Sequence, residues 1–159
     1  MVVSVILYNC SSWSAPKNVL KKLDTCHRRH LRSILNVKWP ATITNTKLYD
    51  ICKTTCLSDR VKLSRWSMLG HILRSPENSL AALSLLFAVI GSKVHKGRKG
   101  AHKTNLLKII REDLKTTAIN DGTGYHTLSL NNQNDIDKLR SIAQDRKKWK
   151  ETFYCRTVL

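Results

Sequence analysis

The spacing of the apolar residues constrains the fold more than any other feature, because they recur every three or four positions along most of the chain. This period predicts amphipathic helices, since side chains three and four residues apart share one helix face. Gly and Pro, at 6 and 3 of 159 residues, are scarce. Only the apolar, β-branched stretch 2–8 predicts a strand. We therefore expect an all-α fold, an irregular array of about six helices with a short N-terminal extended segment.

Capping residues and helix breakers place the ends of the expected helices. Each helix begins near a Ser, Thr, Asn or Pro, and several end before a Pro or at a Gly. The expected helices are Pro16 to Trp39, Thr44 or Asn45 to Cys52, Ser58 to Arg74, Leu80 to Gly91, Thr104 to Leu114, and Asn134 to Phe153. The segment 80–90 is uncharged and apolar, which predicts a buried helix. A turn is expected at 120–125.

The chain divides into four stretches by composition. Residues 1–13 are the extended segment, 14–91 are helical, 92–102 form a basic loop with two glycines, and 103–159 form a C-terminal helical region. A chain of about 150 residues buries roughly two-thirds of its unfolded surface. One compact domain is therefore expected.

The charge balance indicates the class of partner. Lys and Arg number 28 against 11 Asp and Glu, giving a net charge of +17. Such a field repels itself in the compact state, so it favours a polyanionic partner. Nucleic acid is the first candidate, ahead of an anionic membrane surface and an acidic protein, and we predict no membrane partner. Five cysteines without a framework spacing predict reduced thiols and an intracellular location, nuclear or cytoplasmic.

Ten residues are candidate contacts to the phosphates of nucleic acid. The first helix carries four basic residues opposite an apolar stripe centred near Leu23 and Ile34. The third helix leaves a narrow polar stripe between its apolar positions, and the loop 92–102 is the densest positive run. Its glycines allow close approach of a phosphate. The candidates are Lys17, Lys21, Arg28, Arg32, Arg60, His71, Arg74, Lys96, Arg98 and Lys99.

Structural roles are the alternative for several of these residues. The basic side of the first helix is equally typical of a solvated face. In the third helix, Arg60 and Arg74 would pair with acidic neighbours and His71 would bond a carbonyl group.

Three positions carry predictions about the core. Trp66 is expected in the core, and Gly70, in the middle of a helix, is expected to allow close helix packing. Arg146 falls within the apolar arc of the last helix, where a buried guanidinium needs an anionic partner. Asp113 or Glu112 is the expected partner.

The sequence lacks the arrangements of acidic and glycine residues that catalysis would require, and its cysteine spacing offers little for a metal site. The only adjacent acidic pair is Glu112-Asp113, whereas a polymerase or nuclease needs clustered carboxylates for two metal ions. No phosphate-binding glycine motif occurs. Cys52 and Cys56 with a histidine leave a zinc site as an alternative. We predict no enzymatic activity, cofactor, metal or small-molecule substrate.

Five segments carry a resemblance to a known family. They are 8–13 (YNCSSW), 30–39 (HLRSILNVKW) with 43–45 (ITN), 65–74 (RWSMLGHILR), 97–98 (GR) and 142–149 (IAQDRKKW). In this order they resemble the C-terminal, post-palm region of non-LTR (LINE-type) retrotransposon endonuclease–reverse transcriptases. The pattern of that family is broken at Asn9, Ser11 and Lys99.

The resemblance implies a role in RNA-directed DNA polymerisation. The palm carboxylates and the endonuclease would precede residue 1, so 1–13 is expected to be a remnant of the palm-to-thumb connection and 14–91 a thumb-like region. Such a fragment would grip template–primer or target through phosphate contacts without catalysis of its own. Two alternatives are a domesticated basic module that binds an acidic protein and a decayed fragment without function.

Overall fold

A computed structural model describes residues 2–38, 40–91, 105–115, 118–120, 125–127 and 129–154. Within these ranges the chain is mainly helical, which confirms the all-α prediction, with eight α-helices in place of six. The elements are α1 (Val2–Ile6), the 3₁₀ turn η1 (Cys10–Ser12), α2 (Lys17–Ile34), α3 (Asn45–Ile51), α4 (Leu57–Arg74), α5 (Leu80–Gly91), α6 (Leu106–Lys115), β1 (Ala118–Asn120), β2 (Tyr125–Thr127), α7 (Gln133–Gln144) and α8 (Arg146–Tyr154).

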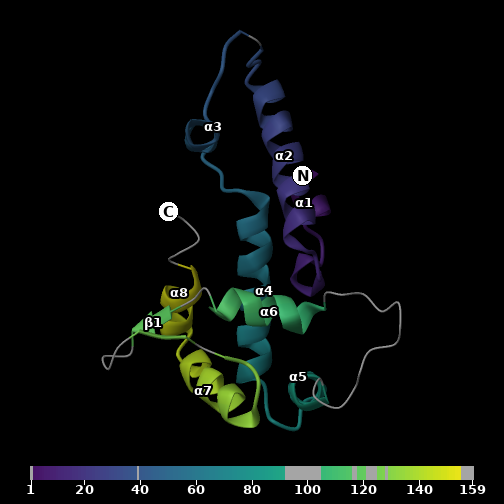
Figure 1. Cartoon of the computed structure of the whole chain (residues 1–159), viewed down its shortest axis with the longest axis vertical. Coiled ribbons are helices and arrows are strands. Elements are labelled where there is room, and N and C mark those ends of the chain that lie inside the picture. Colours follow the sequence, from purple (N-terminus) through teal and green to yellow (C-terminus); the bar gives the residue numbers. More distant parts are fainter. Residues whose placement is uncertain are drawn as a thin grey trace.

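The helices are arranged as a lobe and an arm (Figure 1). The C-terminal half of α2 and the short α3 form the arm, while α5, α6, α7 and α8 surround the lower part of α4 in the lobe. The strands β1 and β2 pair antiparallel, with Ile119 opposite His126. They flank the expected turn, whose residues 121–124 lie outside the described residues.

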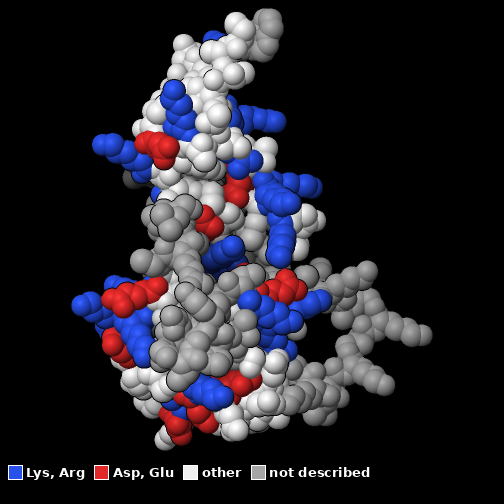
Figure 2. Space-filling view, turned by 60° about the vertical axis from the view of Figure 1, so that its left-hand side comes forward, with Lys and Arg blue, Asp and Glu red and all other residues white. Residues whose placement is uncertain are grey.

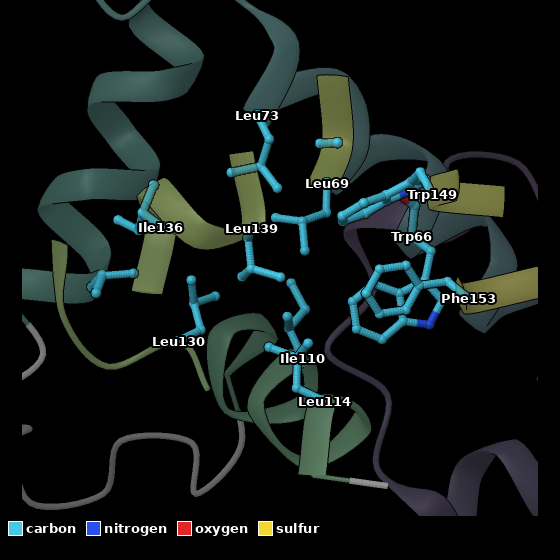
Figure 3. Close-up of a cluster of buried hydrophobic side chains, with 12 residues drawn as sticks. Trp66, Leu69, Leu73, Ile110, Leu114, Leu130, Ile136, Leu139, Trp149 and Phe153 are labelled. Atoms are coloured by element: carbon cyan, nitrogen blue, oxygen red, sulfur yellow. The ribbon is translucent and has the colours of Figure 1, made fainter. Parts of the chain in front are cut away.

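The main core lies in the lobe, where α4 contributes one side of it (Figure 3). Twelve buried residues form the cluster: Trp66, Leu69, Leu73, Val89, Ile110, Leu114, Leu130, Ile136, Leu139, Ala143, Trp149 and Phe153. The Trp66 ring stacks on Phe153 at a centroid distance of 4.4 Å. The indole Nε1 of Trp149 donates a hydrogen bond to the Trp66 carbonyl at 3.1 Å. Burial of Trp66 confirms its predicted place in the core.

Gly70 allows the close packing that its position in mid-helix predicts. A Cβ atom at this residue would lie 2.7 Å from Trp149 Nε1 and 2.9 Å from Cε2 of the same ring. Any side chain here would therefore displace the indole.

The N-terminal segment is a helix, so the predicted strand is wrong. A strand leaves its backbone groups unpaired unless another strand lies beside it. Helix α1 satisfies these groups locally, and the Leu7 N–H continues the pattern by bonding the Val3 carbonyl at 2.9 Å. The side chains of Val5 and Tyr8 remain exposed.

The predicted last helix is divided in two at Asp145. Its carboxylate accepts the backbone N–H groups of Lys147 and Lys148, at 2.8 and 3.1 Å, and so begins α8. This break turns Arg146 into solvent, so the predicted burial of Arg146 is wrong. The buried arginine is Arg65, and its partner is Asp113, one of the two predicted acids, at 3.3 Å.

Other helix ends follow the local signals closely. Thr44 caps α3 as predicted, and α4 ends at Arg74. Helix α4 begins at Leu57, because the Ser58 N–H bonds the carboxylate of Asp24 across the helix pair at 3.0 Å. Asn105 caps α6, where its Oδ1 accepts the Lys108 N–H at 2.8 Å, and Thr104 lies outside the described residues.

Burial was predicted less well than helix ends. Helix α2 ends at Ile34, not at Trp39, because Asn36 adopts a left-handed conformation. Ile34, a centre of the predicted apolar stripe, is 78% exposed, and the neighbouring α3 has only 7 residues to set against the 18 of α2. Helix α5 has the predicted bounds, but Leu80 and Phe87 are exposed on one face, so its full burial was a wrong prediction.

Candidate nucleic-acid interface

The basic residues of α2 form one continuous stripe, which we call the basic track. At about 100° per residue they occupy an arc of about 140° of the helix surface. The track consists of Lys17, Lys21, Lys22, Arg28, Arg29 and Arg32. The only acidic residue of α2 is Asp24. It is buried against α4, where its carboxylate accepts a hydrogen bond from the Ser58 N–H. From Lys17 to Arg32 the track spans about 22 Å at 1.5 Å per residue, the length of about six base pairs.

Hollows in the surface follow the track along the arm. The larger has a volume of about 650 Å³ and is lined by Thr25, Arg28, Arg29, Arg32, Ser33, Asn36, Val37, Lys38 and Asn45. A neighbouring hollow of about 310 Å³ is lined by Lys21, Lys22, Thr25, Cys26 and Arg29. Because the two share Thr25 and Arg29, they form one concave path. Figure 2 shows Lys and Arg outnumbering Asp and Glu over the upper part of the molecule.

Neutral groups hold two arginines of the track, Arg28 and Arg32, in place. Arg28 Nη2 donates to Thr25 Oγ1 at 3.1 Å, and Arg32 Nη2 donates to Asn45 Oδ1 at 2.8 Å and to the Ile43 carbonyl at 3.2 Å. Within the described ranges, none of the six basic side chains of the track forms a salt bridge. The charges of Arg28 and Arg32 are therefore oriented but not neutralised, which suits them to phosphate.

The far side of the arm carries a histidine that adds no charge to the track. The His27 ring lies 6.0 Å from the Tyr49 ring, between α2 and α3. Burial and the nearby Arg60 lower the pKa of His27 below its ordinary value. At neutral pH His27 therefore contributes little to the positive charge of the arm.

A second basic groove lies between α4 and α8, and we call it the α4–α8 groove. It has a volume of about 550 Å³ and is lined by Ser11, Ser64, Ser67, Met68, His71, Arg74, Arg146, Trp149 and Lys150. Arg74 Nη1 donates to the Ala143 carbonyl at 3.1 Å, near the C-terminal end of α7, a position that favours a cation. This neutral partner differs from the acidic neighbour that the structural alternative assigned to Arg74. His71, predicted to bond a carbonyl in the structural alternative, has an exposed side chain.

Sequence reasoning missed several residues of these two surfaces. Lys22 and Arg29 belong to the track, and Arg146 and Lys150 to the α4–α8 groove. The i, i+4 spacing of the latter pair was a usable signal, but it applies only once α8 is recognised as a separate helix. The break at Asp145 supplies that information.

Of the remaining predicted contacts, Arg60 is brought to neither surface, and three others lie outside the described residues. Arg60 donates to Thr54 Oγ1 at 2.9 Å and to Thr55 Oγ1 at 3.5 Å, so it holds the loop before α4 and does not pair with an acid as its structural alternative required. It lines neither the hollows along the track nor the α4–α8 groove. Lys96, Arg98 and Lys99 lie outside the described residues.

The cysteines predicted as alternative zinc ligands do not gather other ligands. In the described part of the chain, no group of three His, Cys, Asp or Glu side chains is placed to hold a metal ion. Cys56 Sγ donates to Asp59 Oδ2 at 2.6 Å, and burial together with this hydrogen bond raises the pKa of the thiol. A protonated thiol is a poor metal ligand.

Also among the described residues, no helix is long and apolar enough to cross a membrane.

Comparison of the chain with protein-family models, with curated proteins and with solved structures gave no match. The resemblance to retrotransposon reverse transcriptases therefore rests on the five sequence segments.

Proposed function

We propose that the chain is the thumb and post-palm region of a non-LTR retrotransposon reverse transcriptase. In this role it binds the phosphate backbone of template–primer or target and performs no catalysis itself. The observation that carries the proposal is the basic track on α2, where six cations follow one helix face and the only acidic residue of the helix, Asp24, is buried and accepts the Ser58 N–H. The resemblance to the family indicates which nucleic acid is bound, namely template–primer or target. The basic track provides the contacts that bind it.

Contact between two of the five resembling segments supports the family part of the proposal. Segment 65–74 forms most of α4, and segment 142–149 includes the start of α8. The tryptophans of these segments meet in the core, where Trp149 bonds the Trp66 carbonyl and lies over Gly70. The distinctive residues of both segments thus belong to one packing unit, which is a reason for them to occur together in a sequence.

Phosphate contacts set the expected character of binding. They position a protein on a strand but carry no base sequence, so we expect weak sequence preference. Each phosphate neutralised by Lys or Arg releases counterions, which gives a log–log salt slope of about 0.9 per contact on duplex DNA. The affinity of the chain for duplex should accordingly fall steeply with salt.

The test compares two triple variants that lose the same charge. Replacing Lys21, Lys22 and Arg29 by Ala removes three exposed cations of the track. The control replaces Lys115, Lys138 and Lys147, which are exposed in the lobe, outside the track and the α4–α8 groove. The track variant should flatten the salt slope by about two to three units, whereas the control should change it little. Fluorescence anisotropy at several salt concentrations measures the slope, and circular dichroism checks the fold.

Two outcomes would contradict the proposal. One is salt-insensitive binding, and the other is an equal change of slope in both triple variants, which would indicate only a response to net charge. A triple Ala variant at 96, 98 and 99 tests the basic loop in the same way. Primer extension on an RNA template with Mg²⁺ or Mn²⁺ should give no product. Reproducible extension by protein free of contaminating polymerase would refute the absence of catalysis.

A further inference from the structure

A separate cavity lies where α2, α4 and α6 meet, at the base of the arm. Its volume is about 280 Å³. Leu20 and Ile109 provide apolar wall, and Lys17, Lys21, Lys62 and Arg65 provide positive charge. The cavity is distinct from the α4–α8 groove and shares only Lys21 with the hollows along the track. We call it the Arg65 pocket.

The guanidinium of Arg65 is the least satisfied group in this region. Its side chain is 2% exposed, and its Nη2 pairs with Asp113 Oδ2 at 3.3 Å. The Nε and Nη1 atoms are buried without a hydrogen-bond partner. Buried guanidinium donors are normally all satisfied, because leaving one unpaired forfeits its hydration without a replacement. Arg65 also lines the cavity, and an anionic acceptor bound there is the kind of partner that its two buried donors lack.

The remaining charges of the pocket also favour an anion. Four cations stand against the carboxylates of Asp24, Glu112 and Asp113. Asp24 already accepts the Ser58 N–H, and Asp113 already pairs with Arg65. The balance leaves one positive charge, which a singly charged anion neutralises. A phosphodiester has this charge, inorganic phosphate and a phosphate monoester carry between one and two negative charges at pH 7, and each offers several oxygen acceptors to the two donors of one guanidinium.

We propose that the Arg65 pocket binds a phosphate group, with Arg65 as the buried donor and Lys62 as a further cation at the wall. This site goes beyond the proposed function, which needs only the surface of α2 and the α4–α8 groove. The phosphate comes from one of two sources, a nucleic acid strand that enters from the track past Lys21, or free inorganic phosphate. The experiment separates them.

The variants are chosen so that the protein still folds. Arg65→Met with Asp113→Leu removes both members of the buried pair together, so that neither stands opposite a missing partner, and does not change the net charge. Lys62→Ala removes one cation from the wall of the pocket and leaves the buried pair intact. Lys22→Ala is the matched control, because it removes one cation from the track outside the pocket. Circular dichroism and urea denaturation confirm the fold of each variant.

The first measurement is thermal melting with inorganic phosphate against chloride at equal ionic strength. The second is the affinity for a single-stranded oligonucleotide with a 5′-phosphate or a 5′-hydroxyl. A saturating rise in melting temperature specific to phosphate, present in Lys22→Ala and absent in the double variant, supports the pocket with free phosphate as its ligand. The alternative result is that inorganic phosphate has no effect, but the oligonucleotide with a 5′-phosphate binds about tenfold more tightly than the one with a 5′-hydroxyl. If the double variant loses that preference, the strand is the source of the phosphate.

The proposal is overturned if neither form of phosphate distinguishes the double variant from the unaltered protein. It is also overturned if Lys22→Ala and Lys62→Ala weaken phosphate binding equally, because that result indicates general charge. The melting experiment needs no oligonucleotide. A negative melting experiment therefore counts against the Arg65 pocket alone. The basic track is tested separately, by the salt slopes of the triple variants.

Discussion

Replacing Gly70 by Ala tests the packing that joins α4 to α8. The new methyl group would lie 2.7 and 2.9 Å from two atoms of the Trp149 indole and 3.1 Å from Arg74 Nη1. Real Cβ contacts below 3.0 Å essentially do not occur. The indole is 2% exposed and contacts both Trp66 and Phe153, so it has little room to move.

Two opposing effects set the size of the change. Ala is favoured over Gly within a helix by about 1 kcal/mol. Overpacking a filled core costs about 1–3 kcal/mol, and loss of the hydrogen bond from Trp149 to the Trp66 carbonyl costs about 1 kcal/mol more. The net expectation is destabilisation by about 1–3 kcal/mol. For a chain of this length that lowers the melting temperature by about 2–4 °C for each kcal/mol.

Gly91→Ala is the matched control, because a Cβ there meets nothing within 4 Å. This variant should be neutral or slightly stabilising. Urea denaturation followed by tryptophan fluorescence measures both free energies of unfolding. If Gly70→Ala proves as stable as Gly91→Ala, the reasoning about the indole contact is refuted.

Three further predictions concern stability. Trp66→Ala should cost about 3–5 kcal/mol in urea denaturation as a core truncation, whereas Tyr8→Ala, at an 82% exposed position, should stay within about 0.5 kcal/mol. Burial raises the pKa of Asp135, but hydrogen bonds from the Asn131 amide and the Ser129 hydroxyl outweigh it and hold that pKa below its ordinary value. Asp135→Ala should therefore cost about 0.5–2 kcal/mol at pH 7, and this difference should disappear in acid melts as the pH falls through the depressed pKa; a constant difference would contradict it. Chelation by EDTA should leave the thermal transition unchanged, and a loss of stability restored by Zn²⁺ would instead indicate a metal site.

Much of the basic track was predictable, because it depends on periodicity within a single helix. Four of its six residues were named from the sequence, since a helix of known phase determines which residues share a face. The α4–α8 groove was only half predictable. His71 and Arg74 were named from one helix, but Arg146 joins them through a second helix whose start depends on the cap at Asp145.

Sequence by itself determined the features that arise from neighbours along the chain. Helix character, the cap at Thr44, the end of α4 at Arg74 and the need for a small residue at Gly70 all follow from local rules. It also required that one buried arginine have an acidic partner. Only the tertiary structure decided that this arginine is Arg65, because periodicity specifies which face of a helix is apolar but not what lies against it.

Exposure of the arm was likewise decided by tertiary structure. The stripe on α2 that includes Ile34 is apolar enough for a core, yet Ile34 is 78% exposed. Burial needs a second element of matching length, and α3, at Asn45–Ile51, is too short to provide it. The basic side of α2 faces away from this stripe, and Lys17, Lys21, Lys22 and Arg29 are exposed there because no packed helix covers their side chains, so the track is accessible to a polyanion.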